Sequence, residues 1–342
     1  MRTQSMTTNH YLRFTKFAAF AVVLAVFGAS ASYGQVTTTI VNDNFSDGIT
    51  NMGSLQTEFF GTSGSNAVEA TSAANSSAGV PSLGLITGTS GRQIHTVFPT
   101  QSLLLTGDTL STVIDFTTPA TVPTSTGAQG NDDIRIGLFD TLGRAGLSGT
   151  VGASSGSPNP LLGCDPSVNV NCTTTTAGLP GYSLELDVDT AADGDPQNLN
   201  IRRSDPSQSG TLLGTNTGIS NLSSSSGDAN YLFQPNTDYQ VSIDIVRNAA
   251  NGLDITATFT DPNGGSVTHM DTDNAPNSFD FGFLGLGAST NAFGSTNSSG
   301  VADNGLEITN VLINFTTAVP EPGSAMLLLG GLGALGLVRR RK

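Results

Sequence analysis

The sequence has no tryptophan, two cysteines and three histidines, and only 12% of its 342 residues are charged. Two cysteines cannot cross-link a chain of this length or form a four-thiolate zinc site. Only His95 and His269 lie outside the N-terminal segment, which leaves little basis for a catalytic triad or a catalytic zinc site. A hydrophobic share of 37% is still enough to form a core, so a folded body is expected.

Basic residues are scarce in the body of the chain. Between Lys16 and the C-terminal basic cluster that starts at Arg339, there is no lysine and there are six arginines, whereas all 27 acidic residues lie in that same part. Such a body repels phosphate backbones, so no nucleic-acid partner is expected. The acidic excess is compatible with binding of divalent cations, or with a role in keeping the protein soluble outside the cell.

The N-terminus has the pattern of a secretory signal peptide over residues 1–31. A basic stretch ends at Lys16, an apolar run covers residues 17–27, and Ala29-Ser30-Ala31 forms a small-x-small cleavage site. The apolar run is shorter than the roughly 20 residues that a membrane-spanning helix needs. Export is therefore predicted, with residues 32–41 leading into the first strand of the body.

The C-terminus, residues 317–342, has the pattern of a second targeting signal. Pro320-Glu321-Pro322 is followed by an uncharged apolar run at 323–338 and by the basic cluster Arg339-Arg340-Arg341-Lys342. The run predicts a short transmembrane helix of about 24 Å, since an α-helix rises about 1.5 Å per residue. The basic cluster would stay on the cytoplasmic side and leave the body outside.

These three elements in this order resemble the PEP-CTERM sorting signal of Gram-negative bacteria. The resemblance implies that an exosortase, a membrane-embedded cysteine protease, recognises Pro320-Glu321-Pro322 and processes the tail. The protein would then reach the cell surface or the extracellular polysaccharide matrix, with a transient inner-membrane tether. The two prolines keep Glu321 in an extended segment outside the helix.

Between the two ends, apolar residues alternate with polar ones at the period of β-strands. The clearest runs lie at 133–140, 181–188, 239–246, 255–259, 281–283 and 306–315; weaker runs lie at 37–41, 57–60, 93–98, 109–116, 199–203 and 266–270. A change of phase between Ile308 and Val311 predicts a β-bulge. Runs bounded by Gly, Pro, Asn and Asp, with no helical period between them, predict antiparallel sheets packed face to face.

The strand rhythm resembles the laminin-G and concanavalin-like jelly rolls, and the fold class expected for residues 42–316 is an all-β antiparallel sandwich of that type. The resemblance implies that the segment starting at Asn42 and the last strand pair near each other. Residues 71–91, 143–180, 204–230 and 287–304 are rich in Ser, Gly, Thr and Asn and are interpreted as long loops. In one of these loops, Cys164 and Cys172 are predicted to form a disulfide in the exported chain.

The segment Glu185-Leu186-Asp187-Val188-Asp189 is similar to the Glu-x-Asp-x-Glu strand of a glycoside hydrolase family with a concanavalin-like sandwich. The similarity implies a nucleophile at Glu185 and an acid/base at Asp189. Retaining hydrolysis requires two carboxyl groups about 5–5.5 Å apart, and Asp189 is one methylene shorter than the glutamate of the family pattern. The alternative is an ordinary strand with Leu186 and Val188 in the core.

Two clusters of aspartates are candidate calcium sites, because calcium takes six to eight oxygen ligands. One comprises Asp187, Asp189, Asp193 and Asp195; the other comprises Asp43, Asp47 and Asp303. The jelly-roll resemblance implies a structural calcium near the paired termini, whereas turn aspartates exposed to water are the alternative.

Three functions are compatible with these patterns. The first is a non-enzymatic cell-surface or matrix protein that is adhesive or binds carbohydrate. The second is a divergent glycoside hydrolase that uses Glu185 and Asp189. The third is an ice- or surface-binding protein, for which regular Thr-x-Thr ladders would be the signature; the consecutive run at 173–176 faces both ways and provides none.

Overall fold

The computed structural model describes the strands of the body and the turns that join them. The described residues are 33–46, 60–61, 67–70, 79–85, 92–120, 133–142, 147–148, 161–162, 179–187, 199–204, 213, 219–222, 233–288 and 306–320. These described residues contain no helix, and therefore no helix that could cross a membrane. The predicted signal peptide and C-terminal helix lie outside the described residues.

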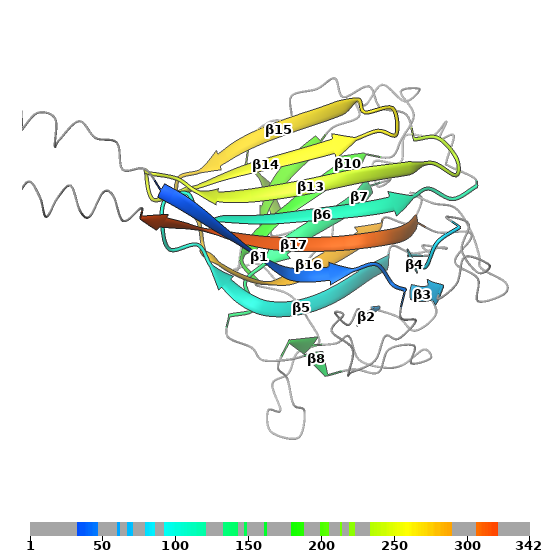
Figure 1. Ribbon diagram of the computed structural model, residues 1–342, viewed down its shortest axis with the longest axis horizontal. Helices are drawn as coiled ribbons and strands as arrows, with labels where there is room; N and C mark the ends of the chain where they lie inside the picture. Colours follow the sequence, from blue (N-terminus) through cyan, green and yellow to red (C-terminus); the bar gives the residue numbers. More distant parts are fainter. Residues whose placement is uncertain are drawn as a thin grey trace, which may run out of the picture. The chain divides into compact units, whose positions relative to one another are not determined.

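Two large antiparallel sheets form the body (Figure 1). The first has the order β15 (Ser266–Asp273), β14 (Leu253–Thr260), β13 (Asp238–Arg247), β6 (Thr109–Thr117), β17 (Leu306–Pro320), β4 (Ser82–Leu85) and β3 (Ala67–Ala70), with β1 (Tyr33–Asp43) also paired to β17. The second has the order β12 (Ile219–Asn221), β11 (Leu199–Ser204), β10 (Gly181–Asp187), β7 (Asp133–Phe139), β16 (Asp280–Ala288), β5 (Arg92–Ser102) and β2 (Phe60–Gly61). A separate ribbon pairs β8 (Leu147–Ser148) with β9 (Leu161–Leu162).

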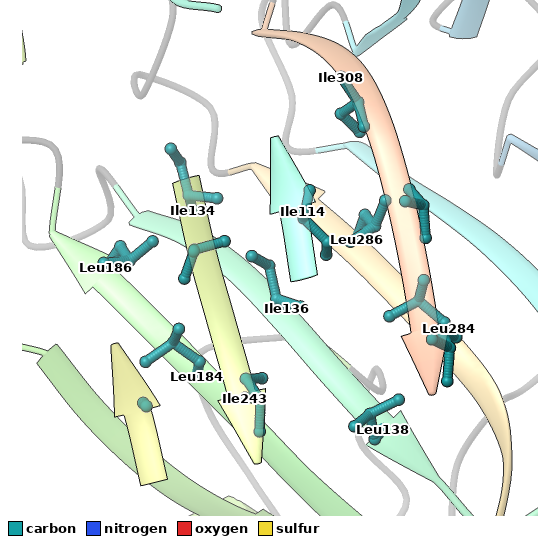
Figure 2. Packing of buried hydrophobic residues seen from close by; sticks show 14 of the residues in the cluster. Ile114, Ile134, Ile136, Leu138, Leu184, Leu186, Ile243, Leu284, Leu286 and Ile308 are labelled. Carbon is teal, nitrogen blue, oxygen red and sulfur yellow. The ribbon is translucent and has the colours of Figure 1, made fainter. Parts of the chain in front are cut away.

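The core lies between the inner faces of the two sheets. Along β13 and β14 every second residue is buried, as the period-two pattern requires. Figure 2 shows Ile114, Ile243 and Ile308 of the first sheet among side chains of the second. At one end of the core, Phe116, Phe233, Tyr239 and Phe259 form an aromatic cluster with ring centroids 4.9–6.1 Å apart. The predicted antiparallel β-sandwich of jelly-roll type is therefore confirmed.

The second sheet differs from the first because its central strands are buried on both faces. Every residue of β16 from Phe281 to Ala288 is buried, and so are the described side chains of β7 and β10. On the outer face, Phe139, Phe283, Leu179 and Leu213 form a second, smaller apolar cluster. Gly137 gives room for this cluster, since a Cβ there would lie 2.4 Å from the ring of Phe139.

The structure confirms some of the predicted strands and loops and corrects others. The register of β17 against β6 shifts between Ile308 and Asn310, which confirms the predicted bulge. The strand β1 pairs with β17, and its side-chain contacts to β17 come from Thr37 and Thr39, upstream of the segment starting at Asn42 that was expected to pair there. The interpretation of residues 71–91 as a loop is wrong for β4, which is fully buried between β3 and β17. The segments 143–180 and 204–230 likewise contain the short strands β8, β9 and β12.

Residues 37–317 form one compact unit. A second unit comprises residues 1–36 and 318–342, of which the structure describes the first residues of β1 and the last residues of β17. The finer limits expected for the signal peptide, leader, sandwich and sorting segment stay predictions.

Candidate functional site

The outer face of the first sheet carries a regular array of polar side chains, which we call the polar face. It is formed by the outward residues of β15, β14, β13, β6 and β17. In register, its four rows are Ser266-Thr260-Gln240-Asp115-Asn310, Thr268-Thr258-Ser242-Val113-Leu312, Met270-Thr256-Asp244-Ser111-Asn314 and Thr272-Asp254-Val246-Thr109-Thr316. All but four of these side chains, namely Val113, Leu312, Met270 and Val246, carry a hydroxyl, an amide or a carboxylate.

Hydrogen bonds between strands hold parts of the polar face in place. Asp115 accepts from Gln240 Nε2 at 2.8 Å and from Asn310 Nδ2 at 3.1 Å, so one carboxylate joins three strands. Asp254 accepts from Thr272 at 2.8 Å. At the edge of the face, β1 adds two further contacts, Thr37–Thr316 at 2.8 Å and Thr39 to Asn314 at 2.9 Å. These contacts fix side-chain rotamers before any ligand binds.

The chemistry of the polar face is neutral to acidic and donor-rich. None of its side chains is basic or aromatic, and Asp115, Asp244 and Asp254 stand in three different rows. Strands lie about 4.8 Å apart and successive outward residues about 6.7 Å apart, so hydroxyls repeat at short intervals in both directions. Such a surface can exchange many individually weak hydrogen bonds with an extended, hydroxyl-rich polymer. This face was not foreseen from the sequence, and the alternation Thr256-x-Thr258-x-Thr260 is the signal that could have revealed it.

Glu185, the predicted nucleophile, lies in β10 on the outer face of the second sheet. It is buried, with 7% of its surface exposed. Its Oε2 lies 2.6 Å from Arg202 Nε and 3.5 Å from Arg135 Nε, and its Oε1 accepts from Arg202 Nη2 at 2.7 Å. Arg135 in turn donates from Nη1 to the carbonyl of Leu213 at 2.8 Å. The carboxylate is thus neutralised by two arginines from neighbouring strands.

This arrangement fits a structural ion-pair cluster better than a nucleophile. A nucleophilic carboxylate must present an oxygen to the substrate, whereas both oxygens of Glu185 are engaged by arginine. Asp187 ends β10, and Asp189 lies outside the described residues, so the separation of the expected carboxyl pair stays untested. The catalytic assignment stays a prediction.

The candidate calcium ligands are mostly outside the described residues. Asp47, Asp303, Asp189, Asp193 and Asp195 all fall there. Asp43 is described at the end of β1; it is buried, and its Oδ1 accepts from the backbone N–H of Phe45 at 2.9 Å. No group of three or more possible metal ligands occurs among the described side chains. Cys164 and Cys172 also lie outside the described residues, so the disulfide stays a prediction.

A polar contact between the two sheets was not foreseen from the sequence. Tyr182 of β10 donates its hydroxyl to Asp273 Oδ2 of β15 at 2.8 Å. Asp273 is buried and also lies 3.2 Å from Arg203 Nη1 of β11. Burial, together with the hydrogen bond to this carboxylate, strongly raises the pKa of Tyr182. The contact joins the two layers at one edge of the sandwich.

The last strand of the first sheet leads directly into the C-terminal segment. Beyond Thr317 come Pro320-Glu321-Pro322, the uncharged run and the basic cluster. Residues 318–342 match the PEP-CTERM protein-sorting motif. The chain therefore carries a PEP-CTERM motif that marks an exported protein of Gram-negative bacteria. The PEP-CTERM motif covers the end of the chain and not the sandwich.

The sandwich is similar to several solved structures at low sequence identity. Basic winged bean lectin with Tn-antigen is 12% identical at a TM-score of 0.42, over 83% of this chain and 99% of that one. The exoplasmic/lumenal domain of VIP36 in its Ca2+/Man-bound form is 10% identical at 0.41, over 80% and 88%. A carbohydrate esterase of the Shiga toxin-encoding bacteriophage phi24B is 12% identical at 0.36, over 82% and 99%. No curated protein matches the sequence.

Proposed function

We propose that the chain is a non-enzymatic protein of the cell surface or extracellular matrix that binds neutral polysaccharide through its polar face. The observation that carries the proposal is the chemistry of that face: four rows of hydroxyl, amide and carboxylate groups with no basic or aromatic side chain. An extended array of this kind suits a long hydrated polymer better than a small ligand, because affinity comes from many repeated contacts. An anionic polymer would be repelled by the three carboxylates.

The route to the surface follows from the C-terminal motif. We propose that the uncharged run at 323–338 tethers the exported body to the inner membrane, with Arg339, Arg340 and Arg341 on the cytoplasmic side. An exosortase then recognises Pro320-Glu321-Pro322 and releases the body toward the polysaccharide matrix. The match of residues 318–342 to the sorting motif supports this route.

A large basic side chain in the middle of the polar face is expected to abolish binding. Ser242 lies in a central row between Thr258 and Val113, so Ser242→Arg inserts a long cation into the middle of the polar face. The measurement is binding of the full chain to a glycan array that includes neutral bacterial polysaccharides. The matched control is Asn263→Arg, an exposed position in the turn between β14 and β15.

We expect wild type and Asn263→Arg to bind neutral glycans and Ser242→Arg to lose at least about tenfold in affinity, the equivalent of about 1.4 kcal/mol. Because the described carboxylates of the polar face form no metal-ligating group, a chelator should leave this binding unchanged. Loss of binding on chelation would instead support the predicted aspartate calcium sites. No glycan signal from any variant would refute the proposal.

A second candidate, binding to ice or another ordered surface, is favoured by one strand. Thr256, Thr258 and Thr260 stand in line along β14, and Thr258 also contacts Thr268 of β15 at 3.2 Å. Asp254 in β14 and Gln240 and Asp244 in the neighbouring β13 interrupt the threonine pattern. This irregularity favours polysaccharide over ice as the ligand of the polar face. Growth arrest of ice crystals by wild type but not by a Thr258→Arg variant would reverse this preference.

A further inference from the structure

The turn between β5 and β6 holds two leucines out in solvent. Leu104 is 73% exposed and Leu105 is 45% exposed, and they are adjacent in the chain. Their neighbour Leu103 is fully buried and donates its backbone N–H to the carbonyl of Phe279 at 2.9 Å. The two exposed leucines therefore project from a turn whose first residue, Leu103, is held in the core.

Buried Asp108 fixes the shape of this turn. Its Oδ2 accepts from the backbone N–H of Leu104 at 2.8 Å and from that of Leu105 at 2.7 Å. Its own backbone N–H donates to the carbonyl of Leu105 at 2.9 Å, and Gly107 donates to the carbonyl of Arg247 at 2.8 Å. Both leucine amides are thus held by Asp108 while both side chains stay exposed.

The same carboxylate connects the turn to the start of the sorting motif. Asp108 Oδ1 accepts from Thr317 Oγ1 at 3.1 Å, and Thr317 is the residue immediately before the motif. The uncharged run begins at Gly323, six residues further on, and six extended residues span at most about 20 Å. A tail inserted in a bilayer therefore keeps the base of this turn within about that distance of the membrane surface.

We propose that Leu104 and Leu105 insert into the lipid interface while the tail tethers the protein, giving a second point of membrane contact. This inference rests on the proposed tethering. Lipid is favoured over a charged partner because the guanidinium of nearby Arg247 is already engaged within the protein: it lies 3.5 Å from the centre of the Phe279 ring and donates to the carbonyl of Leu103 and to Asn251 Oδ1. A small apolar group can insert at the boundary between lipid headgroups and acyl chains without help from basic residues when a tether already holds it near the membrane, because the tether raises its effective concentration there.

The absence of tryptophan makes a direct test possible. The full chain with Leu104→Trp is reconstituted into phosphatidylcholine vesicles whose acyl chains are brominated, and the vesicles are recovered by flotation. The control is Asn263→Trp, in the turn that follows β14. The strand β14 begins near Arg247 and the leucine turn, and it runs for about 24 Å before it reaches the turn that holds Asn263. Both variants keep their backbone hydrogen bonds, and each contains a single tryptophan.

We expect both variants to float with the vesicles, Leu104→Trp to lose most of its fluorescence with a shift to shorter wavelength, and Asn263→Trp to stay bright. Flotation with a bright, unshifted Leu104→Trp would overturn the inference and leave the tethering intact. That result would also be expected if the leucines docked on a membrane protease, which the vesicles lack. Failure of both variants to float would overturn the tethering and this inference together.

Discussion

Replacing Glu185 with glutamine is expected to lower the free energy of unfolding by about 3–5 kcal/mol. The carboxylate is the shared partner of Arg202 and Arg135, whose side chains are only 18% and 7% exposed. Glutamine would present an NH2 group to one of these arginines and leave one buried cation, Arg135, and one partly buried cation, Arg202, without an anion. Breaking a buried ion pair from one side costs this much because the remaining charge keeps its desolvation penalty.

Urea denaturation of wild type and Glu185→Gln measures this effect. The control is Asp244→Asn, the same chemical change on the polar face, where the cross-strand neighbours are Ser111 and Thr256 and not arginines. The control should change stability by less than about 0.5 kcal/mol. If Glu185→Gln were as stable as wild type and had lost a polysaccharide-cleaving activity, Glu185 would be a nucleophile and the structural assignment wrong.

Alkaline pH is expected to destabilise the protein through Tyr182. Burial and Asp273 raise the pKa of this phenol above the value near 10 of an unfolded chain. Below pH 10 the phenol is protonated in both states and its contribution is intact. Above pH 10 the unfolded state loses the proton and the folded state keeps it, so stability falls with pH. The loss approaches about 1.4 kcal/mol per pH unit and amounts to about 2.3 kcal/mol between pH 10 and pH 12.

A Tyr182→Phe variant separates this effect from general alkaline unfolding. At neutral pH it should lose only about 1 kcal/mol, because Asp273 still accepts from Arg203 and from the backbone N–H of Ala275. Above pH 10 its stability should fall less steeply than that of wild type. A residual slope is expected from Tyr239, whose pKa burial also raises. Identical slopes in the two proteins would contradict the assignment to Tyr182.

The sheets were predictable from the sequence because strand period is a local property. The alternation at Tyr182, Leu184 and Leu186 placed these side chains in the core, where the structure has them. The same alternation placed Glu185 on the opposite face of the strand. That face is covered, and the burial of Arg135 and Glu185 depends on packing that local periodicity does not encode.

The polar face and the leucine turn required register between distant segments. Asp115, Gln240 and Asn310 become neighbours only when β6 pairs with both β13 and β17. Asp108 and Thr317 are 209 residues apart in the chain. By contrast, the sorting motif was recognisable because its three elements are contiguous in the sequence, and residues 318–342 match it.

Intact-mass measurement of the protein recovered from the cell surface or matrix of its host tests the central claim most directly. The account predicts a chain that has lost the first 31 residues and the uncharged run with its basic cluster, cut in the neighbourhood of Pro320-Glu321-Pro322. Recovery of the full-length chain from the cytosol, with both terminal segments retained, would contradict export and sorting, and with them the proposed contact between the polar face and extracellular polysaccharide.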